Sequence, residues 1–216
     1  MKTPCVGITM NYILMNRGSD FARCVGDTNA KLAINVTDKL EFDGENMVDF
    51  HFLKQDEFEQ YANELFSILY DNMSQIAPTG NGREEDFLSW FEANKEGLKN
   101  TNRHIIISVR KETHEIVGYF QYTVQNNVLL MEEIQIRKTY QGKYNIFEKI
   151  YGLVLANMRE DVHVVEAYAN KKNTKSIGIL GKLGLSIVGE NKNGTSYHFR
   201  GTYADLLNWH KGINII

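Results

Sequence analysis

Hydrophobic residues recur every three or four positions in several stretches of the chain, and this spacing is that of amphipathic helices. In chain order these stretches cover residues 56–76, a segment after the turn residues 78–82, and residues 144–159 and 174–183. The second stretch begins with acidic residues and carries Phe87, Trp90 and Phe91 on one face. Acidic side chains are favoured in the first turn of a helix. The pattern therefore predicts four helices.

Alternating apolar and polar residues predict strands between these helices. Three segments separated only by tight turns are expected to form an antiparallel meander: residues 104–110, 116–125 and 128–137. A strand at 162–168 precedes the short helix, and two closing strands at 185–188 and 196–200 flank Asn193-Gly194. Looser alternation at 31–42 and 47–53 predicts a hairpin around Asp43-Gly44.

This order of elements predicts an α/β (α+β) fold. We expect a mixed, mostly antiparallel central sheet of about six to seven strands, because a meander is followed by a strand-helix-strand crossover, with helices on both faces. Residues 1–45 are expected to be an extension packed on the domain, since they contain many apolar residues, and residues 46–216 form the domain itself.

The composition supports a folded protein of the cytoplasm. Of the 216 residues, 43% are hydrophobic and 24% are charged, which is typical of a globular chain. No apolar run approaches the length of about 18 residues needed to cross a bilayer, so no membrane partner is expected. Cys5 and Cys24 are too few for a disulfide framework and are expected to be reduced thiols.

The charge is unevenly distributed. Residues 1–136 carry a formal charge of −9 and residues 137–200 carry +6. A basic later part suits a phosphorylated ligand, and an acidic earlier part suits a cationic partner; solvated surface is the simpler alternative, and charge alone favours it. The chain has no basic-aromatic stripe typical of nucleic-acid binding, and its six histidines lack metal-ligand spacing. Neither nucleic acid nor a metal is expected as a ligand.

The junction at residues 132–146 is the first candidate binding site. A strand passes there through a short loop into a helix, and Arg137, Lys138 and Lys143 add positive charge. Helix N-termini bind phosphate groups through unpaired N–H groups and the helix dipole. The junction is therefore a candidate phosphate site, although most such loops bind nothing.

Two motifs in the second half resemble the GNAT superfamily of N-acetyltransferases. Gln141 begins a segment similar to the family's pyrophosphate loop, Gln/Arg-x-x-Gly-x-Gly/Ala, five residues after the strand that ends at Ile136. Further on, Asn173-x-x-Ser176 and then Lys182-Leu183-Gly184-Leu185 are similar to the family's next helix and strand. The resemblance covers roughly residues 50–200 in spacing and element order.

The resemblance implies acetyl-CoA as co-substrate and names the residues that would bind it. The strand residues pair with the pantetheine arm, the loop residues hold the pyrophosphate, and the residues of the later motif complete the site. These residues are Ile134, Gln135 and Ile136 in the strand, Gln141, Gly142, Lys143, Tyr144, Asn145 and Ile146 in the loop, and Asn173 and Ser176 in the later motif.

The chain departs from the family pattern at four positions. Tyr144 and Ile146 stand where the loop usually has small residues, so their side chains are expected to hold the backbone away from a phosphate. Leu130 and Leu180 stand where the family often has its acidic base and its tyrosine acid.

Glu132 is the candidate base, because it lies on the same strand face as Leu130 by alternation. An ion-paired or solvated carboxylate is an equal alternative for Glu132. For Glu133, which alternation places on the opposite face of the strand, that alternative is favoured.

Two functions follow from these observations. The first is an acetyl-CoA-dependent N-acetyltransferase that acts on a small cationic or peptide amine, with the helices of residues 56–98 lining the acceptor pocket. The alternative is a catalytically degenerate member of the same fold that acts as an acyl-CoA sensor or a protein-interaction module. The enzyme is favoured, and a homodimer stays open.

Overall fold

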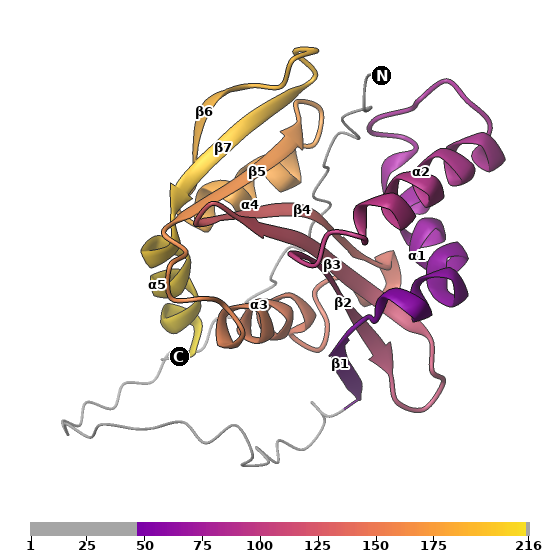
Figure 1. The fold of residues 1–216 in the computed structure, drawn as a ribbon, viewed down its shortest axis with the longest axis horizontal. Helices are drawn as coiled ribbons and strands as arrows, with labels where there is room; N and C mark the ends of the chain where they lie inside the picture. The colour runs from indigo at the N-terminus through magenta and orange to yellow at the C-terminus, as the bar shows by residue number, and fades with distance from the viewer. Residues whose placement is uncertain (1–46, 215–216) are drawn as a thin grey trace.

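The computed structural model describes residues 47–214 (Figure 1). The predicted strand at 31–42 and the packing expected for residues 1–45 lie outside the described part of the chain.

One mixed sheet of seven strands organises these residues. The strands are β1 Val48–Phe52, β2 Arg103–Arg110, β3 Ile116–Gln125, β4 Val128–Ile136, β5 Val164–Asn170, β6 Ser186–Glu190 and β7 Ser196–Thr202. Their spatial order is β1-β2-β3-β4-β5-β7-β6, and every neighbouring pair except β4 and β5 is antiparallel. The predicted fold class, meander and closing strand pair are confirmed.

Helices cover both faces of the sheet (Figure 1). They are α1 Phe58–Met73, α2 Arg83–Gly97, α3 Ile146–Ala156, α4 Thr174–Lys182 and α5 Tyr203–Asn214, with short 3-10 helices η1 Gln55–Glu57 and η2 Lys138–Tyr140. One core cluster joins α1 and α2 to one face of β2 and β3, and a second joins α3, α4 and α5 to the opposite face of the sheet. Helices α1 and α2 also line two cavities.

Helix α5 was not among the predicted elements. Its start has a recognisable signal, because the Asp205 backbone N–H donates to Thr202 Oγ1 at 3.1 Å and Thr202 Oγ1 donates to Asp205 Oδ2 at 2.6 Å. This arrangement resembles a capping box. Leu206 is fully buried and Trp209 packs edge-on against Phe147 of α3, so α5 closes the core beneath β5 and β7.

A close approach of β3 to β4 gives a test of this packing. A Cβ atom added at Gly118 would lie 2.7 Å from the Gln135 backbone oxygen, which cannot move without shifting β4. Gly118→Ala should therefore lower the free energy of unfolding by about 2 kcal/mol in urea titrations. Gly178→Ala is the control, because it faces open space in α4 and should gain up to about 1 kcal/mol. Equal stability of the two variants would contradict the described contact.

Candidate active site

A β-bulge in β4 decides where the acidic residues of this strand point. Gln121 of β3 pairs with Glu133, and the next residue, Tyr122, pairs with Met131, so Glu132 is the extra residue. An extra residue breaks the regular alternation of side chains. The hydrophobic side of β4 shows the break, since the residues that belong to the α3-side core are Leu129, Met131, Ile134 and Ile136.

The bulge places both carboxylates on the same side of the sheet. Glu132 and Glu133 line one cavity of about 450 Å³ between β4 and α2. The expectation that they have opposite orientations is wrong, because strict alternation does not hold across a bulge.

Glu133 is the buried carboxylate of this cavity. Its exposed fraction is 8%, and the Tyr119 hydroxyl of β3 donates a hydrogen bond to its Oε1. Burial raises the pKa of Glu133 from an ordinary value of 4.5 to about 7. The hydrogen bond from Tyr119 lowers this pKa, the charge of Glu132 raises it and the charge of Arg103 lowers it. Burial disfavours the charged form and is the largest of these effects.

Glu132, by contrast, is occupied by donors. Arg103 Nε donates to its Oε2 at 2.7 Å and Gln121 Nε2 donates to the same oxygen at 2.6 Å. Thr123 Oγ1 donates to Oε1 at 2.5 Å. The side chain predicted as the base therefore forms an ion pair with Arg103 and accepts two further hydrogen bonds.

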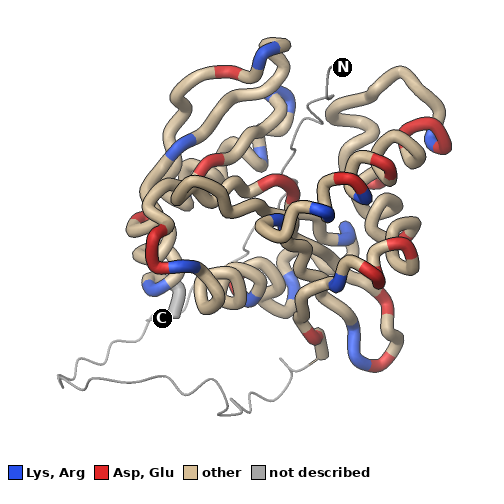
Figure 2. The backbone as a smooth tube through the Cα atoms, in the orientation of Figure 1, with Lys and Arg blue, Asp and Glu red and all other residues tan. Residues whose placement is uncertain are grey.

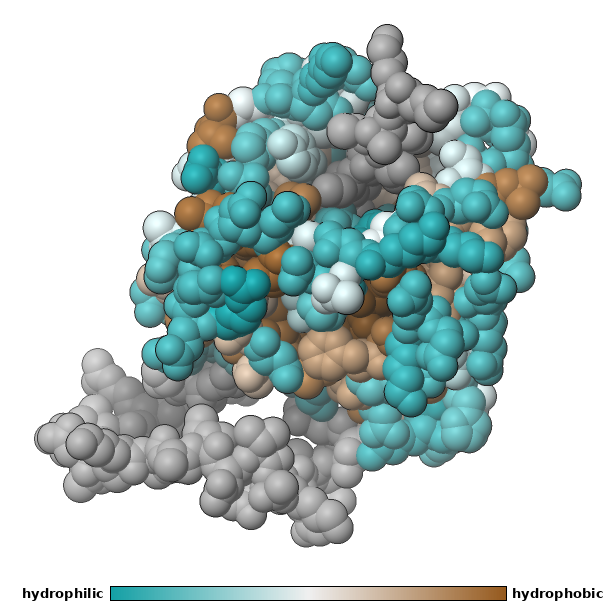
Figure 3. All heavy atoms as spheres, in the orientation of Figure 1, coloured by the Kyte–Doolittle hydropathy of each residue, from teal (hydrophilic) through white to brown (hydrophobic). Residues whose placement is uncertain are grey.

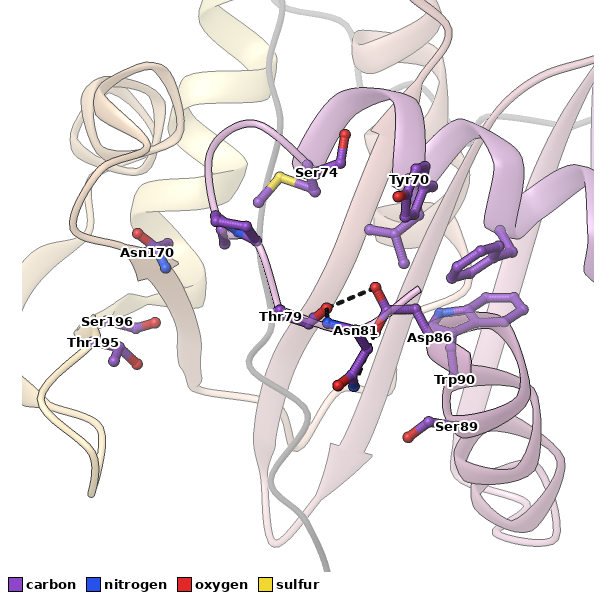
Figure 4. A pocket seen from close by; sticks show the side chains of 16 residues that line it. Tyr70, Ser74, Thr79, Asn81, Asp86, Ser89, Trp90, Asn170, Thr195 and Ser196 are labelled. Carbon is purple, nitrogen blue, oxygen red and sulfur yellow. Dashed lines mark hydrogen bonds between the residues drawn. The ribbon is translucent and has the colours of Figure 1, made fainter. Parts of the chain in front are cut away.

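A larger cavity of about 540 Å³ lies beside the first one, and Trp90 of α2 lines both. Figure 4 shows its polar side chains, with Thr79 and Asp86 on the α1–α2 side and Asn170 and Ser196 across from them. Thr79 Oγ1 donates to Asp86 Oδ2 at 2.8 Å. Residues between Phe66 and Trp90 line the larger cavity and residues between Trp90 and Gly97 line the smaller one, within the 56–98 region predicted to line the acceptor pocket.

The ends of β4 and β5 are not paired with each other. Their parallel ladder covers only Val128–Met131 and 164–167, although β4 continues to Ile136 and β5 to Asn170. Ile134, Gln135 and Ile136, predicted to contact pantetheine, lie in this last part of β4. The Asn72 amide of α1 donates to Gln135 Oε1 and to the Ile136 oxygen, both at 3.0 Å, so α1 fixes the end of β4.

The loop after β4 has an unusual backbone. Gly142, Tyr144 and Asn145 have φ of 74°, 59° and 48°, in the left-handed region. In turns that include left-handed residues, successive backbone N–H groups can point to one side and form a concave surface that binds anions. Lys143 is exposed in this loop. The Gln141 amide folds back and donates to the Ile136 oxygen at 3.0 Å, so Gln141 anchors the loop to β4.

Two residues of the junction do not face the loop as expected: Arg137, expected to add charge for a phosphate, and Ile146, expected to obstruct it. Arg137 Nη2 donates to Glu64 Oε1 at 2.8 Å and its Nε donates to the Ile116 oxygen at 2.6 Å, so its charge is used between α1 and β3. Ile146 is the first residue of α3 and is fully buried in the core, so its side chain points away from the loop surface. The helix begins there and not at Tyr144, which leaves Tyr144 as the bulky side chain of the loop itself.

Asn173 and Ser176 lie together at the start of α4. Asn173 Oδ1 accepts a hydrogen bond from the Ser176 backbone N–H at 3.1 Å and so caps the helix. The Ser176 hydroxyl is buried and has no hydrogen-bond partner among the described residues. Buried polar groups are normally satisfied, so this hydroxyl is a candidate ligand contact.

The remaining surface is largely hydrophilic on the face shown in Figure 3, with hydrophobic residues visible between polar side chains near its centre. Residues 47–214 contain no group of three His, Cys, Asp or Glu side chains arranged for a metal ion. Within the same residues, no helix has the length and apolarity required to traverse a bilayer.

Sequence reasoning did not single out Arg103, Tyr119, Gln121 or Asn72. Hydrophobic periodicity alone assigns no partners to these side chains. Only Gln121 carried a signal, because it and Thr123 are polar residues at alternate positions of an otherwise apolar strand, and buried polar side chains require partners.

Solved structures share this fold. The PaiA N-acetyltransferase from Thermoplasma acidophilum, in complex with coenzyme A, has a TM-score of 0.59 and 12% identity over 72% of this chain and 99% of that chain. The ribosomal-protein-S5-alanine acetyltransferase from Vibrio fischeri has a TM-score of 0.52 and 21% identity over 77% of this chain and 97% of that chain. The spermidine/spermine N-acetyltransferase SpeG from Vibrio cholerae has a TM-score of 0.50 and 13% identity over 75% of this chain and 97% of that chain.

These identities establish the fold and nothing finer. No protein-family model matches the sequence, and no curated protein matches it significantly. Another similar structure is described as an acetyltransferase of the GNAT family. The chain therefore has the GNAT acetyltransferase fold, as the sequence motifs implied.

The raised pKa of Glu133 predicts a pH-dependent stability. Its pKa is about 7 in the folded chain against an ordinary 4.5, so the unfolded chain releases the proton first and the folded chain loses stability as the pH rises from about 4.5 to 7. Glu133→Gln removes this pH dependence. The free energy of unfolding of the variant, relative to that of the wild type, should therefore rise by about 3 kcal/mol between pH 4.5 and pH 8. Urea unfolding at both pH values measures it. A difference that does not change with pH would contradict the burial described.

Proposed function

We propose that the chain is an N-acetyltransferase that transfers the acetyl group of acetyl-CoA to an amine, with Glu133 as the general base. The observation that carries the proposal is the buried Glu133 carboxyl, with a pKa of about 7, in a cavity beside α2. General-base catalysis is most effective when the pKa of the base lies near the working pH. Glu133 replaces Glu132 in this role, because Glu132 is occupied by Arg103, Gln121 and Thr123.

The chemistry requires an amine that has lost its proton. An alkylamine with a pKa around 10 is mostly protonated near pH 7. Glu133 accepts the proton, directly or through one water molecule, as the nitrogen attacks. When bound, acetyl-CoA supplies an acyl group activated as a thioester and a thiol whose ordinary pKa, about 8.5, allows it to leave without a proton donor. Leu180 is a fully buried core residue and takes no part in this scheme.

Several features of the chain fit acetyl-CoA. The ends of β4 and β5 are unpaired with each other, which leaves room for an extended arm beside Ile134, Gln135 and Ile136. The left-handed loop at 142–145 and the first turn of α3 suit a pyrophosphate. The buried Ser176 hydroxyl, which lacks a partner among the described residues, suits a polar contact from α4.

A cationic amine is the acceptor that best suits the cavities. Glu96, Glu132 and Glu133 line the smaller cavity together with the paired Arg103, and Asp86 lines the larger one. Figure 2 shows that acidic residues are frequent on α1 and α2. Two of the similar structures are named as a spermidine/spermine N-acetyltransferase and a ribosomal-protein-S5-alanine acetyltransferase. We infer that the acceptor is a small-molecule or peptide amine, that the protein acts in the cytoplasm and that nucleic acid is not a partner.

A catalytically degenerate acyl-CoA-binding protein is the second candidate. The buried Leu180 and the side chain of Tyr144 in the loop favour it. The two candidates differ in turnover, since both bind the coenzyme and only the enzyme releases free CoA from acetyl-CoA in the presence of an amine.

Replacement of Glu133 tests the proposed reaction. With a panel of polyamines and peptide N-termini, Glu133→Gln should lower kcat/KM by about a hundredfold or more, because the base is lost. Glu92→Gln removes the same charge from an exposed position of α2 and serves as the control. Release of free CoA is the measurement. Full activity in a folded Glu133→Gln variant excludes this base, and no turnover with any amine favours the degenerate protein.

The loop residue Tyr144 gives a test of coenzyme binding. If its side chain keeps the backbone away from the pyrophosphate, Tyr144→Gly should bind CoA about tenfold more tightly in calorimetry. This change equals about 1.4 kcal/mol of binding free energy. Asn145→Gly is the matched control, because it also relieves a left-handed residue, with a φ of 48°, without removing a ring. Affinity of Tyr144→Gly equal to that of Asn145→Gly would show that the phenol ring is not the obstacle.

A further inference from the structure

The Arg103–Glu132 ion pair lies beside the proposed base and is almost buried. The exposed fractions of the two side chains are 16% and 13%. Each oxygen of Glu132 has at least one donor, so this carboxylate is fixed in position. An ion pair that lines the same cavity as a titrating group acts on that group electrostatically.

The β4 bulge couples this pair to Glu133. Gln121 lies opposite Glu133 in the β3–β4 ladder, and yet its side-chain amide donates to Glu132 at 2.6 Å. Both carboxylates therefore face one cavity, and Glu132 is the nearest negative charge on the same strand.

Helix α2 fixes the position of the Arg103 guanidinium. Arg103 Nη2 donates to Asn94 Oδ1 at 3.2 Å, and the Asn94 amide donates to the Trp90 oxygen at 2.9 Å. Gly97 makes space for the guanidinium, since a Cβ atom there would lie 1.5 Å from Arg103 Nη1. The helix that lines both cavities thus also determines how closely the positive charge approaches Glu132.

We propose that Arg103 and Glu132 are positioning residues that set the pH range in which Glu133 acts as a base. This inference rests on the proposed function, which makes Glu133 the base. It assigns Glu132 a role through its charge, without proton transfer of its own.

The charged and titratable groups around Glu133 come from four elements. They are Arg103 of β2, Tyr119 of β3, Glu132 of β4 and Glu96 of α2. Glu132 raises the pKa of Glu133 and Arg103 lowers it. Removal of the two partners should therefore have opposite effects, which a merely structural role would not produce.

The titration of Glu133 in the full chain tests this inference without any turnover. The side-chain carboxyl carbon is followed by carbon-13 NMR and assigned by its loss in Glu133→Gln. Glu132→Gln should lower the midpoint by about one pH unit, and Arg103→Gln should raise it by a similar amount, because a nearby charge favours the opposite charge and disfavours its own.

A glycine variant provides a second route if Arg103→Gln does not fold. Gly97→Ala keeps all charges and favours the helix, while its methyl group displaces the guanidinium from its place. It should move the midpoint in the same direction as Arg103→Gln. Gly181→Ala, which meets open space in α4, is the control and should leave the midpoint unchanged.

The two proposals fail in different ways. Midpoints that do not move, or that move in the same direction in Glu132→Gln and Arg103→Gln, overturn the inference. Opposite shifts support it, and the pH profile of kcat/KM should then shift in parallel in each variant. Opposite shifts in a chain that acetylates none of the amines tested overturn the proposed function and, with it, the role of the pair in catalysis.

Discussion

The arrangement of the candidate site depends on one extra residue in β4. Because Glu132 has no cross-strand partner in the ladder with β3, the strand turns two successive carboxylates to the same face. One of them, Glu132, forms an ion pair with Arg103. The other, Glu133, is buried and accepts a hydrogen bond from the Tyr119 hydroxyl, and burial raises its pKa to about 7. Without the bulge, alternation would place one of the two in the hydrophobic core on the α3 side.

The burial of this carboxyl has a cost in stability that the rest of the fold must offset. Two hydrophobic clusters, one on each face of the sheet, hold the strands in register around it. On the α1 and α2 face, the Trp90 ring packs against Phe58 and Phe66, with ring centroids 5.8 and 5.6 Å apart. Rings this close add to the stability of the helical layer. This layer lines both cavities, so the element that shields Glu133 from solvent is also the element that would meet an acceptor.

The hydrophobic pattern predicted most of the fold, because long periodic segments are determined by burial on one face. The strands of the meander, the crossover and helices α1 to α4 agree with prediction within a few residues. Helix α5 was not predicted, although its 12 residues exceed the lengths of α3 and α4, because its packing depends on contacts with α3 that are distant in sequence. Helix α3 begins at Ile146 because the preceding loop has left-handed residues, which periodicity does not reveal.

The candidate site was less predictable than the fold. Motif spacing located the loop at 141–146 and the Asn173–Ser176 turn, since both depend on residues close together in sequence. The bulge depends on the register between two strands, so alternation gave Glu133 the wrong face. Arg103 and Tyr119 reach the carboxylates from other strands, and nothing local in the sequence indicates such contacts.

The central claim is that Glu133 is the carboxylate that faces the reacting nitrogen. A crystal structure of the chain with a bisubstrate analogue, in which CoA is joined through an acetyl linker to an alkylamine, tests it most directly. The account predicts the amine nitrogen within about 3.2 Å of a Glu133 oxygen, or one water molecule away. A nitrogen that lies against Asp86 in the larger cavity, with Glu133 out of reach of any bridging water, would contradict it.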